Sequence, residues 1–147
     1  MGMRLAVWIT LVGAALGGAG AAFAQAEGPD APADAQAIRD VIRSQIEAFR
    51  RDDGEAAFAL ASPAIRARFG TAENFMRMVR DGYPPVYRPR AYRFLELSLR
   101  DGHPLQKLAL IGPDGFAVLA IYPMVKLEDG SWRTDGCYLM PLEAKDA

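Results

Sequence analysis

Few residues in this sequence are of types that could carry out catalysis. The chain of 147 residues contains one histidine, His103, and one cysteine, Cys137. These two residues cannot build a zinc site with two cysteine and two histidine ligands, and no cluster of carboxylates replaces the missing ligands. The sequence also has no nucleophile-elbow, Walker A or dinucleotide-binding glycine pattern. We therefore predict neither a metal site nor a bound cofactor.

An acid–base enzyme would need a carboxylate, histidine or tyrosine held inside a pocket. His103 follows an Asp-Gly pair that predicts a hairpin tip, where a histidine is exposed to solvent. Glu96 and Asp135 are the carboxylates within strand-like sequence, and both are more typical of a solvated face or an edge. The candidate catalytic residues are Asp135, Tyr92 and Tyr122.

Tyrosine and tryptophan side chains are better candidates for ligand binding, because each joins an apolar ring to a polar tip that needs a partner. A pocket lined by several of them would suit a flat apolar ligand. Phenylalanines at helical spacing predict a hydrophobic core instead. The candidate binding residues are Tyr83, Tyr87, Tyr92, Trp132 and Cys137.

Cys137 has two interpretations. A reactive thiol needs a pKa lowered by an adjacent cation or a helix N-terminus. Arg133, the nearest cation on the same nominal face of the strand, is four residues away. A free cysteine is commonly a small buried hydrophobe. We favour a buried, unreactive thiol, and a reactive thiol is the alternative.

The first residues resemble a secretion signal. Arg4 precedes an apolar stretch, which ends in small residues and an Ala-Phe-Ala sequence at 22–24. This pattern predicts a Sec signal peptide over residues 1–24, cut after Ala24 or, as the alternative, after Ala26. The mature protein would be periplasmic or secreted, with no membrane association after cleavage. A retained N-terminal anchor is the remaining alternative.

The rest of the chain is organised simply. Residues 25–34 are rich in proline, alanine and aspartate and predict a disordered linker. Residues 35–147 predict one domain, since their number suits a single core. A net charge of −1 and the lack of a clustered basic tract argue against nucleic-acid binding.

The first half of this domain is helical in pattern. Apolar residues recur at spacings of three and four from Ile38 to Phe49, which predicts an amphipathic helix. Asp53, Ser62 and Thr71 then stand where N-caps of three shorter helices are expected. Residues 83–92 contain three prolines, which predict an extended connector or, alternatively, a proline-rich ligand for a partner protein.

The second half is extended in pattern. Four β-rich runs are separated by Asp-Gly pairs at 101, 114 and 129, which predicts a four-stranded antiparallel meander. Residues 93–99 alternate, which would place Leu97 and Phe94 on opposite faces. Residues 116–125 are apolar on both faces, so they predict a central strand covered by helices and by further protein, such as a second subunit in a homodimer. The fold class is α+β, with N-terminal helices on one face of a curved sheet.

A further Asp-Gly pair, Asp135-Gly136, lies inside the last β-rich run. Too little chain follows it for a long partner strand. We therefore predict a β-bulge there, where glycine permits the unusual backbone. The extra residue would allow Trp132 and Cys137 to share the inner face of the sheet.

The order and content of these segments resemble the nuclear-transport-factor-two-like superfamily, also called SnoaL-like or cystatin-like. The segments that carry the resemblance are "IEAFRRDDGEAAFALASP", "TAENFMRMV" and "GSWRTDGCYLMPL". The "YPPVYRPR" stretch and the Trp-Arg-x-x-Gly-Cys ending resemble a bacterial family labelled as a domain of unknown function (number 4864). The resemblance covers residues 35–142 and implies a cone in which a bent sheet wraps helices around a pocket.

The resemblance does not choose a function, because some members of the superfamily are enzymes and many only bind ligands or proteins. We expect a non-catalytic module that binds a small apolar ligand or a partner protein. The alternative is an acid–base enzyme of the isomerase, dehydratase or hydrolase type, using the pocket in the cone.

Overall fold

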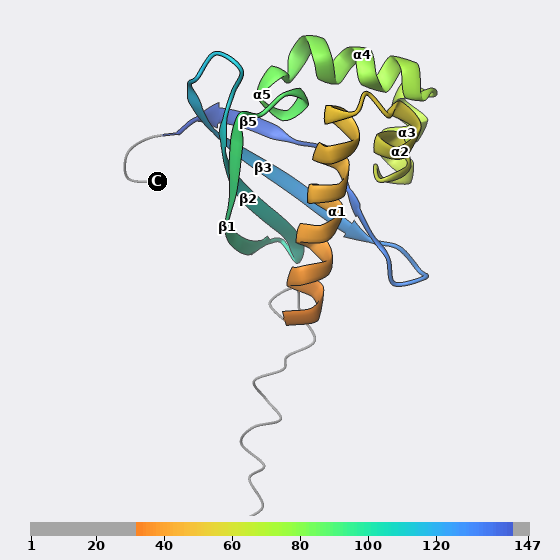
Figure 1. The fold of residues 1–147 in the computed structure, drawn as a ribbon. Helices are drawn as coiled ribbons and strands as arrows, with labels where there is room; N and C mark the ends of the chain where they lie inside the picture. Colours follow the sequence, from red (N-terminus) through yellow and green to blue (C-terminus); the bar gives the residue numbers. More distant parts are fainter. Residues whose placement is uncertain (1–31, 143–147) are drawn as a thin grey trace, which may run out of the picture.

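The computed structural model describes residues 32–142, in which helices are followed by a curved antiparallel sheet (Figure 1). This arrangement confirms the predicted α+β class. The predicted signal peptide and the first part of the predicted linker lie outside the described residues. None of the helices in this range combines the length and the apolar character that a membrane span needs.

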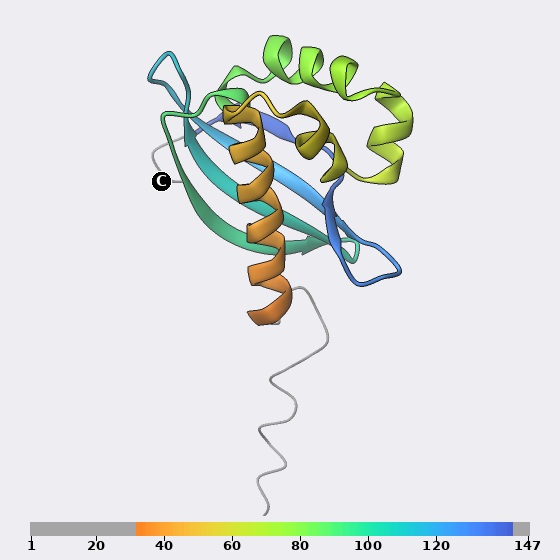
Figure 2. The same ribbon diagram turned by 45° about the vertical axis from the view of Figure 1, so that its right-hand side comes forward.

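The first helix, α1 (Pro32–Arg50), lies across the concave face of the sheet (Figure 2). It begins at Pro32, although we expected order only from residue 35, because proline is favoured in the first turn of a helix, where its missing N–H is not needed. Ile38, Ile42 and Ile46 are fully buried, as the periodicity predicted. Burial of each stabilises the fold by roughly 1.5–3 kcal/mol.

Three predicted N-caps are confirmed, and each begins one of the next helices. The side chains of Asp53, Ser62 and Thr71 accept hydrogen bonds from the backbone N–H groups of the first turns, at 3.1, 3.2 and 3.1 Å. These helices are α2 (Gly54–Ala59), α3 (Pro63–Phe69) and α4 (Ala72–Gly82).

The proline-rich connector differs from its prediction. Pro84–Tyr87 forms a short helix, α5, rather than an extended chain. Two consecutive prolines fit here because they occupy the first turn, where helical N–H groups have no partners within the helix. Val86 is buried, and Arg88 donates to the carbonyl of Phe49. The segment therefore packs onto its own domain.

Within residues 32–142, five strands form one antiparallel sheet. β3 is central, as predicted, with β2 on one side and both β4 and β5 on the other. The last predicted strand is thus present as two pieces. The strands are β1 (Ala91–Arg100), β2 (His103–Ile111), β3 (Ala117–Lys126), β4 (Trp132–Thr134) and β5 (Tyr138–Pro141).

Simple alternation, which separates Phe94 from Leu97, is wrong for β1. Phe94 pairs with Leu108 and Leu97 pairs with Gln106, so a bulge between them brings both onto the inner face. The fully buried Gln106 donates from its amide nitrogen to the carbonyl of Leu95 in the bulge, at 3.0 Å. This bond stabilises the irregular backbone, and no local pattern in β1 itself predicts it.

The outer face of the sheet carries apolar side chains along β3 and β5. Ile121 pairs with Tyr138 and Leu119 pairs with Met140. Tyr138 and Met140 are exposed. The expected homodimer through this face stays a prediction.

Candidate functional site

The predicted bulge at Asp135-Gly136 is confirmed. Met124 pairs with Thr134 and Ile121 pairs with Tyr138, which leaves one more residue on the last strand than on β3. Gly136 has a φ of 126°, a conformation that side-chain-bearing residues rarely adopt. The backbone N–H of Asp135 still donates to the carbonyl of Pro123, at 2.8 Å. The interruption is therefore a defined kink that divides the strand.

The extra residue turns Cys137 toward the interior. Trp132 is buried, and Cys137 packs against the same hydrophobic core. The expectation that the two side chains share the inner face is confirmed. Strict alternation would have separated them.

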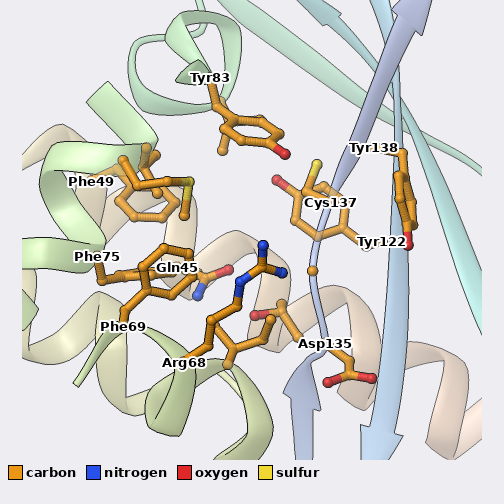
Figure 3. Close-up of a pocket in the computed structure, with 16 residues that line it drawn as sticks. Gln45, Phe49, Arg68, Phe69, Phe75, Tyr83, Tyr122, Asp135, Cys137 and Tyr138 are labelled. Carbon is orange, nitrogen blue, oxygen red and sulfur yellow. The ribbon is translucent and has the colours of Figure 1, made fainter. Parts of the chain in front are cut away.

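A cavity of about 340 Å³ lies between the helices and this interrupted strand (Figure 3). Its volume is at the lower end of the range for small-molecule sites. Side chains from α1, α3 and α4 form an apolar wall. They are Phe49, Ile65, Phe69, Phe75, Met78 and Val79.

Aromatic rings form the centre of this wall. The Phe75 ring lies 6.0 Å from that of Phe49 and 5.9 Å from that of Phe69, measured between centroids. These distances are typical of favourable tilted and edge-to-face contacts. The three rings hold each other in place and present a firm apolar surface to a ligand.

Tyr122 supplies the most unusual group in the cavity. The residue is 2% exposed, and its hydroxyl has no hydrogen-bond partner among the described residues. Burial raises the pKa of this hydroxyl well above 10.0, with a smaller contribution from the neighbouring Cys137 thiol. The Cys137 thiol, a weak acceptor, is a neighbour of the hydroxyl, and the interaction between the two groups contributes to both of their pKa shifts. The hydroxyl therefore keeps its proton at neutral pH and remains a hydrogen-bond donor.

Cys137 lines the same cavity as a protonated thiol. The residue is half-buried as a whole, but its thiol faces the interior. Burial raises its pKa to about 12, although the Tyr122 hydroxyl partly opposes the shift. A thiol with such a pKa is a poor nucleophile at neutral pH. This environment fits the interpretation of a buried, unreactive cysteine.

Asp135 also lines the cavity, but its carboxylate is engaged elsewhere. It accepts a hydrogen bond from the Ser62 hydroxyl at 2.6 Å. Figure 3 shows the carboxylate turned away from the Tyr122 hydroxyl. Asp135 therefore ties the interrupted strand to the start of α3 and does not project into the centre of the cavity.

The polar residues of the cavity that the sequence did not reveal include Gln45, Arg68 and Thr134. Gln45 is buried on the apolar face of α1, and its amide nitrogen donates to the carbonyl of Ala57 at 3.0 Å. A glutamine spaced three and four residues from Ile42 and Phe49 is a signal that could have identified it. Arg68 extends from the exposed side of α3 to the cavity (Figure 3), and no local pattern marks it.

Three predicted site residues lie outside this cavity. The Tyr87 hydroxyl donates to the Asp52 carboxylate, and this bond, together with one from Arg88, lowers the pKa of Asp52. Tyr92 packs on β1, and Trp132 donates from its ring nitrogen to a carboxylate on α1 at 3.3 Å. Of the predicted binding residues, Tyr83 and Cys137 do line the cavity.

These features define the class of the molecule as a helix-and-sheet domain with a mainly apolar pocket on the inner face of a curved sheet. The chain belongs to the family described as Domain of unknown function (DUF4864), whose sequence profile matches residues 31–147. No curated protein and no solved structure matches the chain.

Proposed function

We propose that this protein is an exported, non-catalytic domain that binds a small, mainly apolar ligand in a nuclear-transport-factor-two-like fold. The order of helices and strands, and the way the curved sheet faces α1, support the membership in that superfamily. The signal-like segment at residues 1–24 supports export. N-terminal sequencing of the mature protein tests export, with Gln25 expected as the first residue.

One observation carries the proposal of ligand binding. The cavity combines a firm aromatic wall with a buried Tyr122 hydroxyl that has no partner in the described residues. Leaving a buried polar group without a hydrogen bond costs about 1–3 kcal/mol. A ligand atom that accepts a bond from this hydroxyl would remove that cost, so the site favours occupancy.

Binding is better supported than catalysis. An acid–base enzyme needs a carboxylate or histidine directed at the reacting atoms. Asp135 accepts from Ser62 instead, and His103 is exposed on the hairpin between β1 and β2. The raised pKa of Tyr122 keeps its hydroxyl protonated, so it is unsuited to act as a base.

Native mass spectrometry of the protein purified from its own periplasm tests the proposal. We expect a co-purifying small molecule that Met78→Trp abolishes, because Met78 lines the cavity and a larger side chain would fill it. Met140→Trp is the matched control, since Met140 lies on the outer face of the sheet. Equal occupancy in the two variants, or none in the unmodified protein, would contradict the proposal.

A further inference from the structure

We infer that the ligand is a small organic anion, a carboxylate on an apolar body, which Arg68 and Tyr122 hold by its charged end. This inference rests on the proposed function and names the chemistry of the ligand. Its basis is the distribution of charge and of unpartnered polar atoms around the cavity.

Arg68 is a cation at the cavity without a protein anion. Two arginines on neighbouring helices have acidic partners, Arg50 with Glu47 at 2.9 Å and Arg77 with Glu73 at 3.2 Å. Arg66, on the same helix as Arg68, has none among the described residues, but it lies outside the cavity lining. Within residues 32–142 the Arg68 guanidinium forms no ion pair and no hydrogen bond. It stacks near the Phe69 ring, 5.8 Å from the centroid. Its planar set of N–H donors is therefore available, and carboxylates match that set well.

The carboxylate on the cavity wall does not neutralise Arg68. Asp135 accepts a hydrogen bond from the Ser62 hydroxyl, and it forms no ion pair with Arg68 among the described residues. Arg68 is the only Lys, Arg or His side chain among the described residues that line the cavity. The Arg68 guanidinium would repel a cationic ligand. A neutral ligand would remove the guanidinium from water without supplying the negative charge that offsets this cost.

Tyr122 is the second, independent observation. Its hydroxyl is buried and unpartnered, and Figure 3 shows it turned toward the same part of the cavity as the Arg68 guanidinium and the Tyr83 hydroxyl. Phe49, Phe69 and Phe75 lie to one side of these polar groups. A carboxylate is expected to accept hydrogen bonds from the polar groups while its apolar body lies against the rings.

The test compares two probes that differ only at the polar end, 3-phenylpropanoate and 3-phenylpropan-1-ol. Isothermal titration calorimetry at neutral pH gives the affinity of each for the unmodified protein and for Arg68→Gln. We expect the acid to bind the unmodified protein roughly tenfold to hundredfold more tightly than the alcohol, because hydrogen bonds to charged groups are the strong ones. Arg68→Gln should remove this preference and leave alcohol binding unchanged.

Arg66→Gln is the matched control. Arg66 lies on the same helix, but its guanidinium stacks over Phe58, 5.3 Å from the centroid, away from the cavity lining. This variant should keep the preference for the acid. Binding of the alcohol also reports whether each variant retains a folded cavity.

The possible failures can be told apart. Equal binding of acid and alcohol to the unmodified protein, or a preference that survives Arg68→Gln, would overturn the carboxylate inference and leave the proposed binding function standing. No binding of either probe to the ligand-free protein would overturn the inference and also count against the proposed function.

Discussion

Replacing Tyr122 with phenylalanine removes a single buried oxygen from the wall of the cavity. The hydroxyl has no partner in the described structure, and the residue is 2% exposed. Since an unsatisfied buried hydroxyl costs about 1–3 kcal/mol, Tyr122→Phe should raise the free energy of unfolding of the ligand-free protein by about 1 kcal/mol or more. That gain corresponds to roughly 4 °C in Tm for a domain of this size.

Urea denaturation of ligand-free protein, followed by circular dichroism, measures this difference. Tyr87→Phe is the matched control, because it makes the same chemical change where the hydroxyl donates to Asp52. That variant should be less stable than the unmodified protein, so the two substitutions should have opposite signs. A loss of stability in Tyr122→Phe of more than about 0.5 kcal/mol would refute the reasoning, since it would mean that the hydroxyl has a partner.

The same substitution should have the opposite effect on binding. A ligand that accepts a hydrogen bond from Tyr122 stabilises the unmodified protein more than the variant, by an amount that depends on its concentration relative to Kd. We therefore expect the unmodified protein to be less stable than Tyr122→Phe without ligand and to gain more stability than the variant when ligand is bound. Equal ligand-induced shifts in Tm for the two proteins would contradict a role for the hydroxyl in binding.

Three further predictions concern the interrupted strand. Gly136→Ala should lower the free energy of unfolding by about 1–2 kcal/mol, because residue 136 has a positive φ. The control Gly82→Ala, at the end of α4, should be neutral or stabilising. Thermal denaturation of both variants separates backbone strain at residue 136 from an effect common to any Gly→Ala change. The pKa of the Cys137 thiol is about 12 in the folded protein and 9.0 in the unfolded chain, so the folded protein binds this proton more tightly. The free energy of unfolding should therefore fall by up to about 4 kcal/mol as the pH rises from about 9 to about 12. Cys137→Ala should show less of this fall, and rapid modification of the native thiol at pH 8 would contradict its burial. Ser62→Ala should lower the free energy of unfolding, measured by urea denaturation, by about 1–2 kcal/mol, because Ser62 both caps α3 and bonds to Asp135 of the interrupted strand. Thr71→Ala, which removes only a helix cap, should cost less. Equal losses in the two variants would indicate that the bond to Asp135 contributes nothing.

Local signals were sufficient for much of the fold. The caps at Asp53, Ser62 and Thr71 and the Asp-Gly hairpins depend on residues within a few positions of each other, so the sequence predicts them directly. The bulge at Asp135-Gly136 was also predictable, because glycine within an otherwise continuous strand marks a change in backbone. Trp132 and Cys137 were placed on one face by counting the extra residue.

The remainder depends on contacts between distant parts of the chain. The bulge in β1 is stabilised by Gln106 from the next strand, and alternation within residues 93–99 carries no sign of it. Arg68 lines the cavity because α3 starts at Ser62, which is hydrogen-bonded to the interrupted strand. Tyr87 and Trp132 were assigned to the site by residue type, yet their polar atoms bond to carboxylates outside it. Residue type shows which side chains need a hydrogen-bond partner. The packing of the folded chain determines which of them find that partner in the protein and which remain unpaired at the cavity.

The link between Ser62 and Asp135 has a consequence for the order of folding. It joins residues 73 positions apart and is reinforced by backbone bonds from Ser62 to Thr134 and from Thr134 to Leu60, at 2.8 and 3.0 Å. Contacts of such long sequence separation form slowly, because closing the loop between them costs chain entropy. We therefore expect the helices to assemble first and the cavity to be completed when the last strand docks. A chain truncated before residue 132 is expected to retain helical content and to lack the binding site.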